Sequence, residues 1–522
     1  MAKFHTVQKN SANAERQPGN NAGLPKHNNR VETPNAQKPS TSQGDQQGDG
    51  LAVQQNKATE AERARLASYV ETIQRGEKDR DRCFRQIVDA CYHIQEDELY
   101  KKVAGYVTEA AFFKARFGYS RSHSLRLAQE GRLLNRLSPG GDNELLSSDA
   151  HCRPLLKLGE TEQDEAIKLA KKLARIASIP GISAKLVETC VILLNPPRQP
   201  KKMASLRRQL AEKFCGIVEK AKAALPKGAD EMVRKLLDKI AKQALALGGA
   251  NRASLIDWTD MTWDVQAGCS HCSEGCDHCW AAKMTATRMR DIFPGLAKET
   301  KIRGESTWAF TGKIVLLPEQ LAEPLKDPEP KRYFLNSRSD TFHPDVPDEF
   351  IDLVFSVMEA AHWHFFQVLT KRPERMAEYT QRRYKDRPPP QNIWCGTSVE
   401  NQETFDERII HLRNVKAAVF WLSVEPMLGP IKFGDLSRIG WVVVGGESGS
   451  DRRMEKAWVI DARDQCKKFN VPFFFKQWGD FDEDGQKSKQ KAKKDHLIPS
   501  ATLDGVVYDA YPEPPIAEGH KV

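Results

Sequence analysis

The feature that most constrains the fold is an alternation of short apolar runs with helical segments after residue 257. The β-rich runs are Met261–Val265, Tyr333–Asn336, Phe365–Leu369, Ile393–Thr397, Val419–Ser423, Trp441–Val444 and Pro472–Phe475. Between them lie Ala281–Ile292, Pro347–Ala361, Pro373–Tyr384, Thr404–Leu412 and Ala457–Phe469, which have helical patterns. Because parallel strands need a crossover connection, usually a helix, this order predicts an α/β fold, either a complete or partial parallel barrel or a doubly wound sheet.

Polar residues recur where the predicted strands end. They are Ser339, Asp340, Lys371, Arg372, Glu400, Asn401, Glu425, Glu447, Ser448, Lys476 and Gln477. The carboxyl ends of barrel strands converge on one mouth, where active sites form. Any one of these side chains could be a helix cap or an ion-pair partner, but the series favours a polar pocket.

Four cysteines lie close together in the segment GCSHCSEGCDHCWA, residues 268–281. Cys272, Cys276 and Cys279 have the spacing C-x3-C-x2-C, and Cys269, Cys276 and Cys279 have C-x6-C-x2-C. Either set supplies three thiolates for a 4Fe-4S cluster and leaves its fourth iron open. Zinc is the alternative, because the cysteines and the nearby histidines also suit a tetrahedral site. Disulfides are the weakest interpretation for an intracellular chain.

The N-terminal half has a different organisation. Residues 1–58 are rich in Asn, Gln, Gly, Ser and Pro and predict a disordered tail. Residues 59–195 are helical in pattern, and Thr108–Leu134 has the spacing of a helix-turn-helix, with a turn at Gly118 and Ser120 as N-cap. This segment resembles helix-turn-helix regions of phage and plasmid proteins, which implies DNA contacts by Arg121 and Arg126. A helical hairpin without a DNA role remains the alternative.

The rest of the chain divides by composition. Residues 196–256 form a linker and a basic helical segment, in which positions 201–245 hold twelve basic and five acidic side chains. Residues 257–480 hold the predicted barrel, and 481–522 form a basic loop and C-terminal extension. The mean hydropathy is −0.58. No run approaches the roughly 20 apolar residues of a membrane span, and no secretory signal opens the chain, so we expect a cytoplasmic protein without a membrane partner.

Nine motifs in the C-terminal half resemble one family. They are TWDVQAGC, GCDHCWA, SDTFHPDVPDEF, VLTKRPERM, WCGTSVENQ, WLSVEPMLGP, WVVVGGESG, VPFFFKQWG and LDGVVYDAYP. Together they resemble the phage-associated, radical-SAM-like family of uncharacterised proteins often encoded beside a three-Cys-motif partner protein. The usual cysteine spacing of that family carries over to Cys269, Cys276 and Cys279, with Cys272 as an addition.

The resemblance implies a radical SAM type of barrel with an iron-sulfur cluster and S-adenosylmethionine as cosubstrate. Gly445, Gly446 and Glu447 resemble the glycine-glycine-glutamate element that binds the amino group of the cosubstrate, although here it follows a late strand. A tight turn is the alternative. Glu425 is expected to help orient the cosubstrate.

The remaining candidate site residues are Asp340, His343, Lys371 and Arg372. They are expected to bind substrate or move protons, since their charges suit a ribose, an amine or a phosphate. Nucleic acid or a partner protein is the expected substrate. A zinc-containing DNA-binding module and a non-catalytic assembly factor remain the alternatives.

Overall fold

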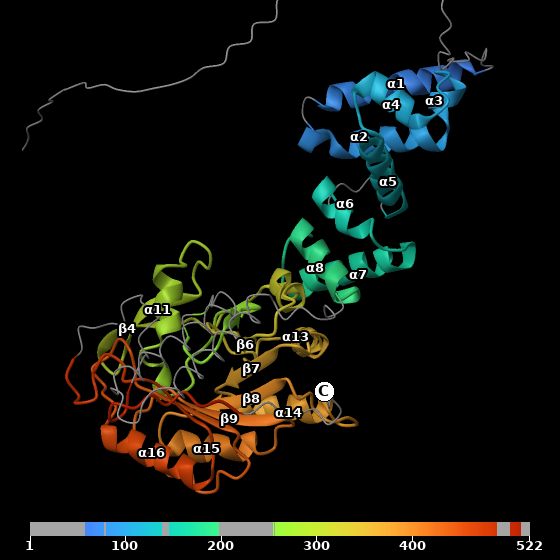
Figure 1. Cartoon of the computed structure of the whole chain (residues 1–522). Helices are drawn as coiled ribbons and strands as arrows, with labels where there is room; N and C mark the ends of the chain where they lie inside the picture. The colour runs from blue at the N-terminus through green and yellow to red at the C-terminus, as the bar shows by residue number, and fades with distance from the viewer. Residues whose placement is uncertain are drawn as a thin grey trace, which may run out of the picture. The chain divides into compact units, whose positions relative to one another are not determined.

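The computed structural model describes residues 58–77, 80–137, 146–197, 254, 256–487 and 502–512. Within them lie an all-helical region and an α/β region (Figure 1). The predicted tail lies outside the described residues except for residue 58. Most of the predicted linker and basic segment, and much of the C-terminal extension, also lie outside them.

The helical region contains eight described helices. They are α1 Glu60–Gly76, α2 Arg80–Glu96, α3 Leu99–Lys102, α4 Glu109–Phe117, α5 Arg121–Leu137, α6 Asp149–Leu155, α7 Glu160–Ile176 and α8 Ala184–Leu194. Helix α1 begins at a capping box between Thr59 and Glu62, in which each residue satisfies a backbone N–H of the other. The helical patterns of the sequence predict Ala61–Glu77, Asp79–Ile94 and Asp164–Ala177. Helices α1 and α2 agree with the first two within two residues, and α7 begins four residues before the third.

Helices α4 and α5 form the predicted pair around Gly118. The glycine has φ +72°, a left-handed conformation that ends α4 at low steric cost. Ser120 Oγ then accepts a hydrogen bond of 3.3 Å from the backbone N–H of His123, which confirms Ser120 as the cap of α5. The DNA contact expected of this pair stays a prediction.

The α/β region is built on one curled, seven-stranded sheet in which every neighbouring pair is parallel. Its strands, in spatial order, are β1 Met261–Trp263, β6 Arg332–Leu335, β7 Phe365–Thr370, β8 Ile393–Ser398, β9 Val419–Val424, β10 Trp441–Gly445 and β11 Phe473–Gln477. Each predicted strand is present within two residues at either end. The prediction of a partial parallel barrel is therefore confirmed, and the doubly wound alternative is wrong because the strand order never reverses.

Helices connect the strands of this half-barrel and cover one face of it (Figure 1). They are α13 Asp348–Ala360, α14 Pro373–Arg383, α15 Gln402–Leu412 and α16 Lys456–Lys468. Alternate strand residues such as Phe366, Val368 and Leu422 are buried in the core on this face. Both faces of the central strands are buried, which explains their nearly continuous apolar sequence.

The opposite face carries a cluster of four buried tryptophans, Trp258, Trp394, Trp421 and Trp441. Their rings meet mainly edge to face, as Trp258 does against Trp441 with an interplanar angle of 85°. A Cβ on Gly396 would lie 2.5 Å from the ring of Trp421, so β8 needs a glycine at that position.

Residues 508–511 run beside β11 and pack against the tryptophan cluster. The backbone N–H of Phe475 in β11 donates to the carbonyl of Tyr508 at 2.8 Å, and the Trp441 indole in β10 donates to the carbonyl of Ala510 at 2.9 Å. At the other side of the sheet the guanidinium of Arg332 in β6 stacks 4.0 Å above the ring of Tyr511. The segment thus links β10 and β11 to β6.

The sequence patterns missed the small sheets. Strand β2 Gln266–Ala267 pairs with β5 Val315–Leu316, and β3 Ala297–Ile302 pairs with β4 Glu305–Phe310. Helix α11 Trp280–Thr287 ends five residues before its predicted end. Two further short helical elements are η3 Pro318–Gln320 and α12 Glu323–Lys326. None of the helices in the described ranges has the length and apolar content needed to cross a bilayer.

Candidate functional site

The cysteines lie on a loop at the carboxyl edge of the half-barrel. Gly268 follows β2 with φ +95° and forms a parallel bridge with Ser339 after β6. A Cβ on Gly268 would lie 2.1 Å from the carbonyl oxygen of Lys313, so only glycine fits there. The loop continues through the short 3-10 helix η2 Glu274–Cys276 to Cys279, which is the N-cap residue of α11. The loop thus contacts residues that follow β6, β7 and β8, namely Ser339, Arg372 and Glu400.

The four thiols differ in exposure and contacts. Cys269, Cys276 and Cys279 are half-buried, whereas Cys272 is exposed. The sulfur of Cys272 lies 3.9 Å from that of Cys276. The guanidinium of Arg372 donates to the sulfur of Cys269 at 3.8 Å. The three half-buried thiols are those with the C-x6-C-x2-C spacing.

The loop environment separates the thiol pKa values. The hydrogen bond from Cys272 lowers the pKa of Cys276 to about 4, and the positive charge of Lys371 acts in the same direction. The same hydrogen bond raises the pKa of Cys272. Burial raises the pKa of Cys279, and burial together with the charge of Asp340 raises that of Cys269 to about 12. Cys276 is therefore the thiol that the loop favours as a thiolate.

Asp340 holds Arg372 against the loop. Its carboxylate accepts from Arg372 Nη1 at 2.8 Å, from Thr370 Oγ1 at 2.7 Å and from two backbone N–H groups. Arg372 Nη2 donates to Ser270 Oγ at 2.9 Å. Asp340 is thus fully engaged in positioning Arg372, and Arg372 is the group that reaches the cysteines.

His343 contacts the same serine. Its Nε2 lies 2.9 Å from Ser270 Oγ, and its Nδ1 accepts from the backbone N–H of Asp345 at 3.2 Å. Because Nδ1 is an acceptor, the neutral ring carries its proton on Nε2 and donates it to Ser270. Burial lowers the pKa of His343, and the nearby charge of Arg372 lowers it further.

Lys371 belongs to a second buried charge cluster. Its ammonium group contacts Glu400, which also accepts from Arg408 Nη1 at 3.0 Å and from Ser273 Oγ at 3.0 Å. Glu400 is 0% exposed. Burial alone raises the pKa of Glu400, but the charges of Lys371 and Arg408 outweigh it and lower that pKa. Burial likewise lowers the pKa of Lys371, and the charges of Glu400 and Cys276 outweigh it and raise the value.

The glycine-glycine-glutamate element fits tightly between its neighbours. A Cβ on Gly445 would lie 2.7 Å from a carboxylate oxygen of Glu425, and one on Gly446 would lie 2.3 Å from the carbonyl oxygen of Trp478. Glu425 pairs at 2.8 Å with Lys476 across this glycine. The packing alone accounts for both glycines, and their cosubstrate role stays a prediction.

Glu447 ties this element to the cysteine loop. Arg452 donates to its carboxylate through Nε at 2.6 Å and Nη2 at 2.5 Å, and also donates to the carbonyl of Glu274 at 3.2 Å. Ser450 Oγ donates to Glu447 at 2.5 Å. The glutamate is thus already neutralised by one cation within the chain, and a bound amine would share it with Arg452.

The structure gathers Asp340, His343, Lys371 and Arg372 around the cysteine loop, and their expected roles in substrate binding or proton movement stay predictions. Sequence reasoning missed Ser270, Ser273, Arg408 and Arg452 as site residues. Arg408 and Arg452 lie on other connections, and basic residues are too frequent for their partners to be identified from spacing. Within the described part of the chain, no group of three or more Cys, His, Asp or Glu side chains is arranged to hold a single metal ion.

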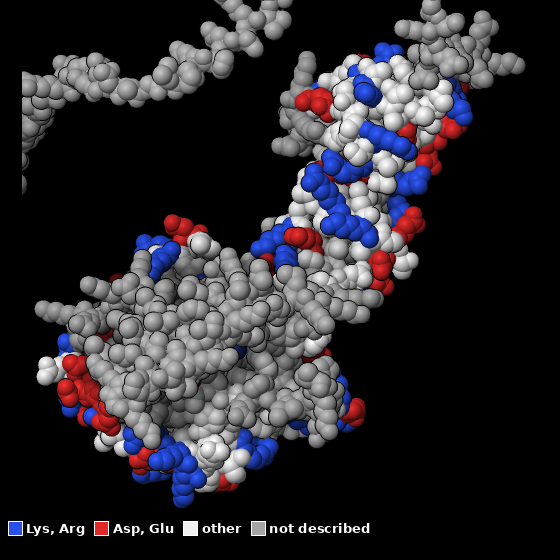
Figure 2. Space-filling model, viewed as in Figure 1, with Lys and Arg blue, Asp and Glu red and all other residues white. Residues whose placement is uncertain are grey.

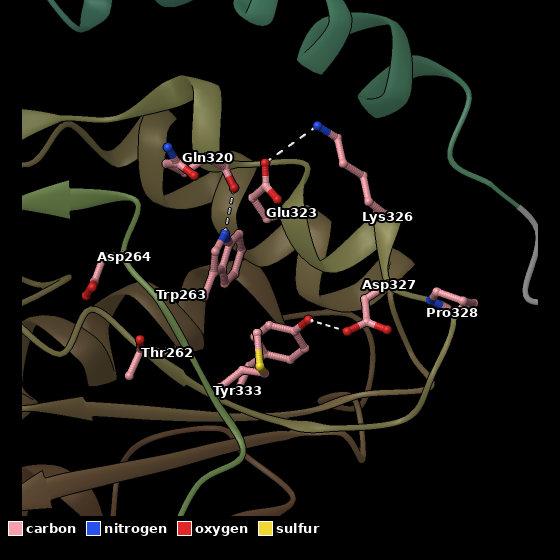
Figure 3. Close-up of a pocket in the computed structure, with 10 residues that line it drawn as sticks. Thr262, Trp263, Asp264, Gln320, Glu323, Lys326, Asp327, Pro328 and Tyr333 are labelled. Atoms are coloured by element: carbon pink, nitrogen blue, oxygen red, sulfur yellow. Dashed lines mark hydrogen bonds and ion pairs between the residues drawn. The ribbon is translucent and has the colours of Figure 1, made fainter. Parts of the chain in front are cut away.

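Two cavities lie beside β1 and contain none of the cysteines. One of about 460 Å³ is lined by the side of β1 and by α12 residues, and Figure 3 shows Trp263 directed at the carbonyl of Gln320 and Tyr333 at Asp327. The other, of about 680 Å³, shares Thr262, Asp264 and Gln320 with it. The sequence patterns identified neither.

The predicted DNA-contacting arginines differ in their surroundings. Arg121 is exposed. Arg126 faces inward, with Nε 3.5 Å from Glu130 and 3.6 Å from Asp149, and Nη2 3.0 Å from His123. Lys and Arg side chains are numerous on the face of the helical region visible in Figure 2, with Asp and Glu beside them. Arg121 is therefore the better placed of the two for an outside ligand.

Comparisons with known proteins found similarity for only part of the chain. Residues 253–512 match a family described as "Protein of unknown function (DUF5131)". Two structures of spore photoproduct lyase, one complexed with dinucleoside spore photoproduct and one a point mutant, are 13% identical to the chain. The matches cover 52% and 48% of this chain and 81% and 73% of theirs, each with a TM-score of 0.22. No curated protein matches the chain.

Proposed function

We propose that the chain is a radical-SAM-like iron-sulfur protein that holds a 4Fe-4S cluster on Cys269, Cys276 and Cys279. The observation that carries the proposal is the gathering of these three half-buried thiols on one loop at the carboxyl edge of a parallel half-barrel. Three cysteines of one loop suffice for three irons of such a cluster. The exposed Cys272 is outside this ligand set.

The charges beside the loop suit this donor set. Three thiolates bound to a cluster carry net negative charge, and Arg372 and Lys371 supply positive charge next to them. The Arg372 hydrogen bond to Cys269 is the kind of contact that tunes a cluster thiolate. When bound, the cluster would supply the electron for reductive cleavage of S-adenosylmethionine.

The surrounding side chains then have separate tasks. Arg372 and Lys371 balance the charge of the thiolates, and Asp340 and Glu400 hold these two cations in place. Glu447, which Arg452 links to the cysteine loop, and Glu425 would orient the amino group of the cosubstrate. His343 holds a proton on Nε2 next to Ser270 and would donate a hydrogen bond through it to a substrate group bound there.

The substrate we propose is nucleic acid or a partner protein, with duplex DNA held through the helical region. The exposed Arg121 at the start of α5 supports a nucleic-acid ligand, since a helix N-terminus with an exposed cation can meet a phosphate.

Anaerobic reconstitution followed by iron, sulfide and zinc analysis tests the proposal. Wild-type protein should contain four irons and four sulfides per chain, and Cys276→Ala and Cys279→Ala should lose them. Cys272→Ala is the matched control and should keep the full iron content. Stoichiometric zinc without iron would instead favour the zinc-containing module. An iron-replete, reduced sample that forms no 5′-deoxyadenosine from S-adenosylmethionine would favour the assembly factor.

A further inference from the structure

We propose that Cys272 and Cys276 form a reversible disulfide in the cluster-free protein, so that oxidation blocks cluster loading until a thiol reductant reopens the loop. The proposal concerns the ligand loop of the proposed cluster. It is carried by the contact between the two sulfurs, 3.9 Å apart, and by the exposure of Cys272.

The loop holds the two cysteines side by side. The backbone N–H of Cys276 donates to the carbonyl of Ser273 at 2.9 Å, which folds η2 back so that Cys276 faces Cys272. The turn is anchored at three points, by Ser273 Oγ on Glu400, by the carbonyl of Glu274 on Arg452 and by Gly275 packed on Glu400. The folded loop therefore already holds the two sulfurs next to each other. They need only a small further approach to reach the S–S bond length of about 2.0 Å.

The two positions have complementary roles in disulfide exchange. Cys272 is reachable from solvent, so a small disulfide such as oxidised glutathione can exchange with it and release one glutathione thiolate. The Cys276 thiolate then attacks the Cys272 sulfur, forms the intramolecular bond and releases the second glutathione thiolate. Overall the two thiols lose two protons and two electrons, and one oxidised glutathione becomes two reduced molecules.

The disulfide would block cluster loading because Cys276 belongs to both candidate sets of cluster ligands. Both candidate ligand sets contain Cys276, so a chain with the disulfide retains at most two cysteines of the loop for iron. Transient, redox-sensing disulfides are the kind that intracellular proteins use. Cys272 would thus bind Cys276 in a reversible disulfide under oxidising conditions, and it would not be a cluster ligand.

Mass spectrometry on full-length, iron-free protein tests the bond directly. After oxidised glutathione, and alkylation under denaturing conditions, wild-type peptide mapping should join Cys272 to Cys276, with two alkylated thiols fewer than in the reduced sample. Dithiothreitol should restore both thiols. Cys272→Ser should not form this link, and Cys83→Ser, which removes a half-buried thiol of α2, should form it as the wild type does. A link between any other pair, or none, would overturn the proposal.

Iron uptake tests the consequence. The oxidised wild type should take up iron and sulfide only after reduction, whereas oxidised Cys272→Ser should load as fully as its reduced form. Equal loading of oxidised and reduced wild type would refute the block. If the disulfide maps as expected but reduced protein never takes up iron, the proposed cluster fails and the disulfide stands. If the reduced protein takes up iron fully but no disulfide forms after oxidation, the disulfide proposal fails and the proposed cluster stands.

Discussion

Replacing Gly275 by alanine should disturb the cysteine loop through one defined contact. The new Cβ would lie 2.4 Å from Cγ, 2.7 Å from Oε1 and 2.9 Å from Cδ of Glu400, all well inside van der Waals contact. Glu400 cannot swing away cheaply, because Lys371, Arg408 and Ser273 hold its carboxylate. The loop must therefore shift, and overpacking of this kind costs about 1–3 kcal/mol. If Glu400 moved instead, loss of its buried pairs would cost about 3–5 kcal/mol.

Tryptophan fluorescence during urea unfolding measures this loss in the right part of the molecule, since all ten tryptophans lie at or beyond residue 258. Gly429→Ala is the matched control, because its Cβ would meet only Asn401 at an ordinary 3.7 Å. Glu400→Ala removes the clashing atoms, so the double variant should be less destabilised than the sum of the single variants. An unchanged unfolding midpoint for Gly275→Ala, or strict additivity in the double variant, would refute the argument.

Four further outcomes are expected. The substitution Glu400→Gln should lower the free energy of unfolding by about 3–5 kcal/mol relative to the wild type at pH 7. Because the pKa of Glu400 is lowered on folding, its stabilising effect is complete above its unfolded pKa of about 4.3 and is lost as the pH falls through its folded pKa. In urea titrations the difference in free energy of unfolding between wild type and Glu400→Gln should therefore shrink below about pH 4 and stay constant above it. Gly396→Ala should cost about 1–3 kcal/mol and alter the near-ultraviolet circular dichroism, because its Cβ meets the Trp421 ring; an unchanged spectrum would contradict this packing. Glu447→Gln should weaken equilibrium binding of S-adenosylmethionine without loss of iron, and equal affinity would remove its proposed role. Arg121→Ala should weaken retardation of duplex DNA by the full chain at low salt, and a wild type that retards no DNA would end the nucleic-acid hypothesis.

The parallel half-barrel was predictable because its strands are buried on both faces. Runs such as Trp441–Val444 are continuously apolar, and that pattern identifies a buried parallel strand without information on its neighbours. The β3–β4 hairpin was missed for the opposite reason. Its strands AKETKI and ESTWAF contain many polar residues and only one buried position, so neither alternation nor apolar runs distinguish them from a loop.

The site was predictable where residues are close in sequence or follow a strand. The cysteine spacing identified the loop, and strand ends identified Asp340 and Lys371. Their tasks could not be predicted, because those depend on partners from other connections. Arg452 follows β10 and donates to the carbonyl of Glu274 in the cysteine loop, 178 positions earlier in the chain, and no local pattern links the two.

The last described segment of the chain links strands that the sheet order keeps apart. Tyr511 lies against Arg332 of β6, Trp441 of β10 and Phe474 of β11, so one side chain joins an early strand to the two last ones. The same ring covers part of the tryptophan cluster. Order in this short segment and packing of the inner face of the sheet therefore depend on each other, although more than 250 residues of sequence separate Tyr511 from Trp258.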